Sequence, residues 1–167
     1  DQKIEIDYNK NNFLIKGLGQ IKFEEKFENI NFIISKIDNK FNFDTQIDLE
    51  KTSFIIDFLN FKKKDNSKTK LIIKGNHNSQ NELNFTEILI KENNNKINFE
   101  NLLLDEDNLI IKIDKVDLKY FDKENKKNEF LILRNKNNNY KINGSSFNAN
   151  KLIDNLLNNT SGENSKI

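Results

Sequence analysis

The sequence has no cysteine, no proline and a single histidine among its 167 residues. Without cysteine, the chain cannot form disulfides, thiolate zinc sites or a cysteine nucleophile. One histidine, His77, excludes a metal site built from several histidines. Because Lys and Arg total 27 and Asp and Glu total 26, the chain also lacks the basic excess that a nucleic-acid-binding surface needs. We therefore expect no nucleic-acid partner.

Long apolar runs and targeting segments are missing as well. No window approaches the roughly 18 consecutive apolar residues that span a membrane. The sequence contains no methionine, and its first residues already alternate like a strand rather than resembling a signal peptide. We expect the chain to be a mature or excised piece of a longer protein, with any membrane anchor or targeting segment outside it.

The abundant residues follow nucleotide composition more than function. Lysine occurs 26 times against one arginine, and isoleucine 23 times against one valine. These favoured amino acids, like asparagine, have A/T-rich codons, which indicates an extremely AT-rich genome. Asparagine runs such as 93–95 and 137–139 are therefore interpreted as solvated turns rather than as aggregation signals.

Alternation of apolar and polar residues with a period of two dominates the chain and predicts β-strands. The strands are expected at 4–8, 13–17, 21–23, 30–34, 41–49, 54–59, 71–73, 85–90, 97–104, 109–113, 116–121, 130–133 and 140–142. Polar turn clusters recur about every 10 to 16 residues, a rhythm typical of an antiparallel meander. Within the second strand region, Gly17-Leu18-Gly19 predicts a bulge or kink.

One segment, 148–157, is predicted to be helical. Asn148 is a suitable N-cap, and four apolar residues would share one helix face: Leu152, Ile153, Leu156 and Leu157. We expect this short amphipathic helix to dock on the sheet. Residues 1–158 are then a single β-rich domain or a segment of a longer β-groove protein, and 159–167 are a flexible tail or linker.

Chemistry-bearing residues gather into no catalytic pattern. His77 lies in a polar stretch that predicts a loop, with no nucleophile or metal ligand at a suitable spacing. The acidic run 105–107 lacks the spacing and glycine of an EF-hand, so a charged turn is favoured over a calcium site. The basic run 62–64 is interpreted as a solvated turn. We expect no enzymatic activity, no cofactor and no metal site.

The predicted fold is all-β, an antiparallel meander forming a curled open sheet or groove with the short C-terminal helix. A curled open sheet could leave an apolar trough that acyl chains fill, since each buried methylene contributes about 0.8 kcal/mol. Two closed architectures remain as alternatives. One is a β-sandwich used as a structural or adhesion module, and the other is a lipocalin-like β-barrel carrying one small apolar ligand.

A short stretch near the C-terminus adds a resemblance. Residues 140–149 read Tyr-Lys-Ile-Asn-Gly-Ser-Ser-Phe-Asn-Ala, and two apolar pairs follow at 152–153 and 156–157. The stretch resembles a pattern in the AsmA-like superfamily of bacterial envelope proteins. There, a strand ends in Gly, a small residue and Phe-Asp/Asn-Ala before a short Leu-Ile helix. The resemblance is detailed only over residues 140–157; elsewhere it consists of strand rhythm alone.

The resemblance implies a function and a location. Members of this superfamily are anchored in the inner membrane, extend into the periplasm and carry phospholipid along β-sheet grooves. By resemblance, the chain would be a non-catalytic segment that binds or conducts lipid, tethered to the inner membrane through a segment outside it. Its partners would be phospholipid or another acyl-chain ligand and neighbouring β segments of the same parent chain. Alternation suggests four groove-lining residues: Ile97, Phe99, Ile111 and Ile113.

Overall fold

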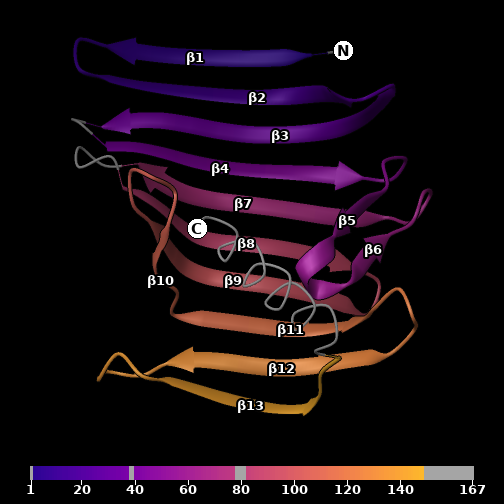
Figure 1. Ribbon diagram of the computed structural model, residues 1–167. Coiled ribbons are helices and arrows are strands. Elements are labelled where there is room, and N and C mark those ends of the chain that lie inside the picture. Colours follow the sequence, from indigo (N-terminus) through magenta and orange to yellow (C-terminus); the bar gives the residue numbers. More distant parts are fainter. Residues whose placement is uncertain (1, 38–39, 78–81, 149–167) are drawn as a thin grey trace, which may run out of the picture.

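The computed structural model describes residues 2–37, 40–77 and 82–148, and over these ranges the chain is almost entirely β (Figure 1). Eleven strands form one sheet, and two more form a separate hairpin. The strands are β1 (Lys3–Asn9), β2 (Asn12–Phe23), β3 (Lys26–Ile37), β4 (Lys40–Leu49), β5 (Phe54–Ile56), β6 (Phe61–Lys63), β7 (Thr69–His77), β8 (Leu83–Glu92), β9 (Asn95–Leu104), β10 (Ile110–Lys112), β11 (Lys115–Phe121), β12 (Lys127–Arg134) and β13 (Tyr140–Ser146). A single 3-10 turn, η1 (Asp57–Leu59), joins β5 to β6.

Every strand pair is antiparallel, and the sheet is open. Its order is β1-β2-β3-β4-β7-β8-β9-β11-β12-β13, with β10 folded back on β9. Among the described strands, β1 and β13 each have one neighbour and do not pair with each other. The predicted antiparallel meander with an open sheet is therefore confirmed. The closed barrel is not formed, and the two-stranded β5–β6 sheet is too small to make the second layer of a sandwich.

The register of the sheet aligns a continuous series of apolar residues on one side, which we call the apolar face. Ile6 pairs with Ile15, Ile15 with Ile34 and Ile34 with Phe43 across the first four strands. The same alignment continues to the other edge of the sheet. Its later pairs are Ile47–Leu71, Leu71–Ile90, Ile90–Ile97, Ile97–Leu118, Leu118–Phe130 and Ile132–Ile142. Because side chains alternate along each strand, the opposite face receives mainly polar and charged residues, together with apolar residues such as Leu18, Ile33 and Ile72.

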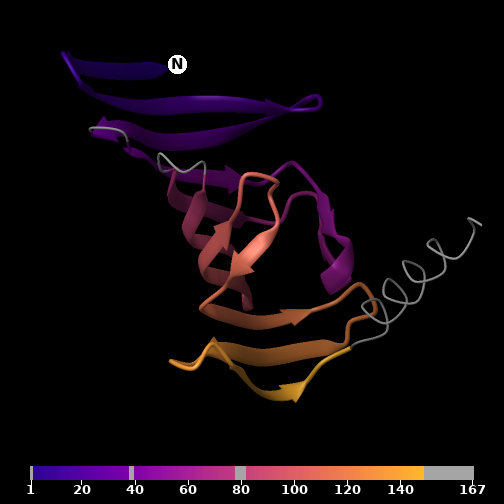
Figure 2. The same ribbon diagram turned by 60° about the vertical axis from the view of Figure 1, so that its left-hand side comes forward.

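The sheet curls around its apolar face. In Figure 2 the strands β1–β4 and β11–β13 lie above and below the central strands, and β5, β6 and β10 lie on the enclosed side. The β5–β6 hairpin is inserted between β4 and β7, which are neighbours in the sheet. An insertion in the chain therefore folds over one part of the apolar face and leaves the sheet itself continuous.

Asparagine takes the place of glycine in the turns. Seven asparagines have a positive φ, but none of the glycines in the described part of the chain does. Asparagine tolerates this left-handed conformation better than other non-glycine residues. Three five-residue turns, 105–109, 122–126 and 135–139, repeat one geometry in which the first side-chain oxygen accepts backbone N–H groups two and four residues on. The asparagine at the fourth position is left-handed each time.

Three local predictions are wrong. The strand β2 runs unbroken through 17–19 and pairs with β3 without a register shift, so the two glycines form no bulge. The segment predicted as one strand at 54–59 breaks after Ile56 into η1, because the chain must reverse there to form the hairpin. His77 ends strand β7, where it pairs with Phe41, instead of lying in a loop.

Two further predictions lie outside the described residues. The helix expected at 148–157 has only its N-cap, Asn148, inside the described range, and the expected tail at 159–167 lies wholly beyond it. None of the helical structure in the described ranges is long and apolar enough to cross a membrane.

Candidate functional site

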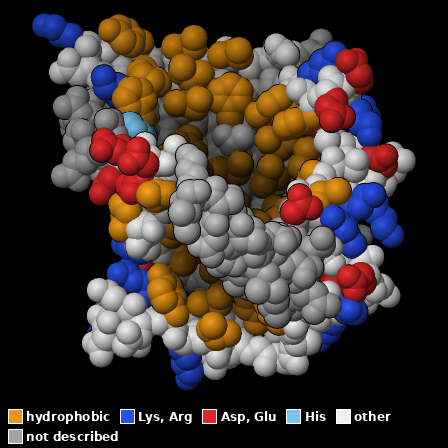
Figure 3. All heavy atoms as spheres, in the orientation of Figure 1, with side chains coloured by type: hydrophobic (Ala, Val, Ile, Leu, Met, Phe, Trp, Pro, Cys, Tyr) orange, Lys and Arg blue, Asp and Glu red, His pale blue; other side chains and the backbone are white. Residues whose placement is uncertain are grey.

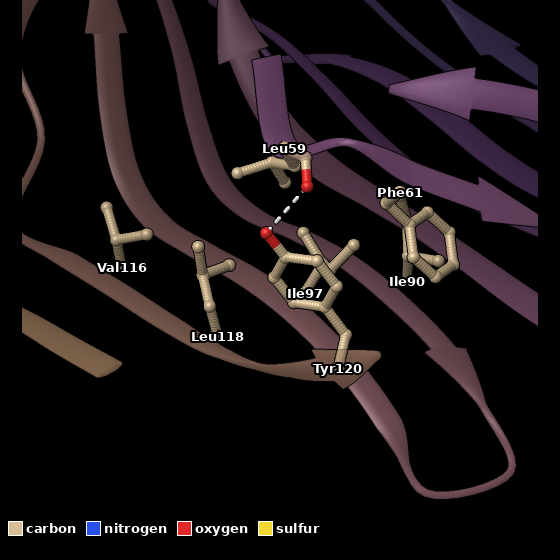
Figure 4. Close-up of a cluster of buried hydrophobic side chains, with 7 residues drawn as sticks. All are labelled: Leu59, Phe61, Ile90, Ile97, Val116, Leu118 and Tyr120. Atoms are coloured by element: carbon tan, nitrogen blue, oxygen red, sulfur yellow. Dashed lines mark hydrogen bonds between the residues drawn. The ribbon is translucent and has the colours of Figure 1, made fainter. Parts of the chain in front are cut away.

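The hairpin covers the centre of the apolar face and creates the best-buried part of the molecule (Figure 4). Leu59 and Phe61 come from the hairpin, and the sheet supplies the rest of this cluster: Ile90, Ile97, Val116, Leu118 and Tyr120. The rings of Phe61 and Tyr120 meet edge to face, with centroids 5.8 Å apart. The hairpin is therefore held by the same apolar residues that line the sheet.

Polar contacts fix the tip of the hairpin to β11 and to the turn that follows β11. The Tyr120 hydroxyl donates a hydrogen bond of 2.8 Å to the carbonyl oxygen of Leu59, as Figure 4 shows. Beside it, the backbone N–H of Lys123 donates to the carbonyl oxygen of Asn60 at 2.9 Å. Burial raises the pKa of Tyr120, and the nearby Asp122 carboxylate acts in the same direction. The phenol therefore stays protonated and remains a donor at neutral pH.

The base of the hairpin is fixed by buried charged groups. The Lys63 ammonium is fully buried and donates to the carbonyl oxygens of Glu50, at 3.2 Å, and Lys64, at 2.9 Å. Burial lowers the pKa of Lys63, although the carboxylates of Glu92 and Glu28 oppose that effect. The Glu28 carboxylate accepts the N–H of Glu50 at 2.9 Å and also binds the N–H at position 52. These contacts tie the chain leaving β4 to β3 and β6.

Beyond the hairpin tip, the apolar face is hollowed into a cavity of about 780 Å³. The cavity lies over β9, β11, β12 and β13 and is bordered by the hairpin tip and β10. Its lining residues are Phe58, Leu59, Phe99, Ile110, Ile113, Val116, Leu118, Phe130, Ile132, Ile142, Gly144, Ser145, Ser146 and Phe147. Among the described residues, the lining contains no ionisable side chain, and its side-chain hydroxyls belong to Ser145 and Ser146. The volume falls within the range of about 300–1,000 Å³ that is usual for small-molecule sites.

At the other end of the sheet the apolar face is open to solvent. The apolar side chains of β1, which are Ile4, Ile6 and Tyr8, are all largely exposed. Figure 3 shows hydrophobic atoms gathered over the first strands of the sheet and again near the last strands. Contiguous exposed apolar surface of this kind marks binding sites in soluble proteins. The apolar face is therefore covered by the hairpin in the middle, forms a cavity near β13 and is exposed to solvent near β1.

The opposite face carries cross-strand ion pairs among polar and scattered apolar side chains such as Leu18 and Ile33. Lys96 contacts Asp117 at 2.6 Å, Lys115 contacts Glu100 at 2.7 Å, and Lys74 lies 3.6 Å from Asp44. Such partly exposed pairs contribute little stability individually. They place charged residues on this face from β4 to β11.

The four residues predicted to line a groove are placed differently by the structure. Phe99 and Ile113 line the cavity, whereas Ile97 is 1% exposed and lies in the cluster beneath the hairpin. Ile111 is 50% exposed, and it is Ile110, its neighbour on β10, that borders the cavity. Sequence reasoning missed the cavity residues on β12 and β13 and at the hairpin tip. Ile132 and Ile142 lie in segments with the same alternation of apolar and polar residues, so the sequence could have identified them. No sequence pattern identifies Phe58, because its position depends on the chain reversal at η1.

The described residues offer no metal centre, and three comparisons with known proteins found no match. No group of three or more His, Asp or Glu side chains within these ranges is arranged to hold a metal ion. The acidic run 105–107 forms a turn in which the Asp105 carboxylate binds the N–H groups of Asp107 and Leu109. No protein-family model, curated protein or solved structure matches the chain.

Proposed function

We propose that the chain is a non-catalytic lipid-binding segment whose apolar face holds acyl chains. The observation that carries the proposal is the register, which aligns apolar side chains from β1 to β13 on one side of an open sheet. A surface of this kind is costly to expose to water, and the β5–β6 hairpin covers only its centre. The uncharged cavity gives the same face a concave part suited to hydrocarbon.

The energetics favour a hydrocarbon ligand. Each buried methylene contributes about 0.8 kcal/mol, so an acyl segment of about a dozen carbons gains roughly 10 kcal/mol before the cost of immobilisation. No polar group of the ligand needs a partner inside the cavity, which offers only two side-chain hydroxyls. Binding of this type needs neither a cofactor nor a catalytic residue.

The setting of this function follows the resemblance at residues 140–157. We propose that the chain belongs to the periplasmic side of a bacterial cell envelope and is tethered to the inner membrane by a segment outside it. The free edges of β1 and β13 support neighbouring β segments of the same parent chain as partners, since an unpaired edge strand offers a row of N–H and C=O groups. Such pairing would extend the apolar face beyond this chain.

The test is lipid retention by matched charge variants. The double variant Ile4→Glu/Ile142→Glu places one carboxylate at each end of the apolar face. The control, Leu18→Glu/Asn143→Glu, adds the same charge to the opposite face of β2 and β13, at exposed positions. Native mass spectrometry and solvent extraction should find phospholipid on the wild type and the control, and much less on the first variant.

Two results would contradict the proposal. One is the repeated absence of lipid from the wild type after exposure to phospholipid vesicles. The other is equal lipid loss in both double variants, since this would point to an effect of net charge instead of an effect of the face. Far-ultraviolet circular dichroism of all three proteins checks that the sheet is intact.

A further inference from the structure

We propose that phospholipid binds end-on, with one acyl tail inside the cavity near β13 and the headgroup outside it. This inference rests on the proposed function and adds a position and an orientation to it. The apolar face has two candidate places for a tail, the bare surface over β1–β3 and the cavity over β9–β13. The structure distinguishes them by shape, lining and boundaries.

Shape favours the cavity. A tail on the bare surface near β1 would contact protein on one side only and keep the rest of its methylenes in water. In the cavity it would lie between the sheet, the hairpin tip at Phe58 and Leu59, and β10 at Ile110. Because the gain is proportional to the apolar area removed from water, the position bordered by three elements is the stronger site.

The lining identifies which part of the ligand enters. Headgroups carry phosphate and need charged or hydrogen-bonding partners, and none of the described residues that line the cavity has an ionisable side chain. An extended peptide would also be a poor occupant, because its unpaired amide groups would meet only the hydroxyls of Ser145 and Ser146 among the described lining residues. A saturated hydrocarbon tail has no group left unsatisfied. The lining thus selects the tail, and the charged headgroup stays in solvent.

The hairpin supplies the inner wall of the site. Leu59 belongs both to the buried cluster and to the cavity lining, and its carbonyl oxygen is held by Tyr120. Beyond that point toward β7 and β8, Phe61 and Ile97 fill the space with side chains and are each 1% exposed. A tail entering from the β13 side therefore stops against the hairpin and does not continue along the sheet.

The absence of tryptophan from the chain allows a direct test. Ile142→Trp places a single fluorophore on β13 at the cavity, and Ile6→Trp places one on β1. The two native residues are matched, being 67% and 68% exposed on the same face and on opposite edge strands. Each variant is incubated with vesicles of phosphatidylcholine dibrominated in its acyl chains and then separated from them by flotation. Bound lipid is quantified as phosphorus, and fluorescence is compared with protein loaded with unbrominated lipid.

Bromine quenches tryptophan only at short range, so the pattern locates the tail. We expect Ile142→Trp to lose more than half of its fluorescence and Ile6→Trp to lose almost none, at equal bound lipid. Equal quenching of both, or quenching of Ile6→Trp alone, overturns the end-on site while leaving lipid binding by the face intact. If neither variant retains lipid, the proposed function itself fails.

Discussion

A glycine on the apolar face provides the sharpest test of the packing. Gly17 is buried in β2, with Ile4 opposite it on β1 and Phe32 opposite it on β3. A Cβ atom at position 17 would lie 2.2 Å from both Cε1 and Cζ of Phe32. The Phe32 ring thus occupies the space that any larger residue would need, which explains why a glycine interrupts the apolar alternation here.

The size of the effect follows from two opposing contributions. Carbon atoms in contact are normally about 3.5–4.0 Å apart, so Gly17→Ala forces the ring to retreat by more than about 1 Å. Overpacking of this kind costs about 1–3 kcal/mol. Alanine also restricts the unfolded chain, which stabilises the fold by about 0.4–1 kcal/mol where the backbone is compatible, and Gly17 has no positive φ. We expect a net loss of about 1–2 kcal/mol in the free energy of unfolding.

Urea denaturation followed by circular dichroism measures this loss of stability. Two further variants test whether the Phe32 ring causes it. At Gly19 the nearest atom to an added Cβ is Gln2 Cγ, at 2.9 Å, which belongs to a flexible side chain. Gly19→Ala should therefore cost much less. In a Phe32→Leu background, Gly17→Ala should lose most of its penalty. The reasoning is refuted if Gly17→Ala is as stable as the wild type, or if its cost is the same with and without the Phe32 ring.

Two further changes probe the anchoring of the hairpin through pH. Tyr120→Phe leaves the buried carbonyl oxygen of Leu59 without its donor and should cost about 1–3 kcal/mol. Because burial raises the pKa of Tyr120, the folded state holds its proton above pH ~10, where an unfolded tyrosine ionises, so wild-type stability should fall with rising pH there. Urea titrations across that range should show a smaller decline for Tyr120→Phe, and equal declines would contradict the assignment. For Glu28, burial works to raise the pKa, but hydrogen bonds from the backbone at Glu50 and Thr52 outweigh it and hold the pKa below 4.5. This stabilisation should be complete above pH 4.5 and lost as the pH falls through the lowered pKa. In an acid titration, Glu28→Gln should lack this pH-dependent loss of stability. An unchanged acid profile would show that the Glu28 carboxylate does not anchor the hairpin base.

Much of the local structure could be predicted because strand and turn signals act over a few residues. The alternation over 41–49 became β4 with its apolar residues on one face, and the acidic run 105–107 became a turn. The three repeated turns were detectable in principle, since each pairs a leading Asp or Asn with an Asn three positions later. The predictions failed where a contact with a residue distant in the sequence determines the residue type, as the Phe32 ring does at Gly17.

The candidate site was predicted less well than the sheet. Alternation assigned Phe99 and Ile97 to the same face, and nothing local distinguishes Phe99, which lines the cavity, from Ile97, which the hairpin buries. That difference depends on where residues 54–63 return to the sheet, and this is fixed by contacts with β11 about 60 residues further along the chain. Residues close in sequence can therefore have different roles without any local signal.

Sequence alone determined that the chain forms strands, because a period of two in apolar residues has only one secondary structure that satisfies it. It also determined the turns, where asparagine supplies left-handed backbone in a chain with only five glycines. The tertiary structure decided which strands are neighbours, that the sheet stays open, and which part of its apolar face is covered, hollow or bare. These properties arise from long-range pairing and from one inserted hairpin, whose apolar contacts form only once strands distant in sequence have come together.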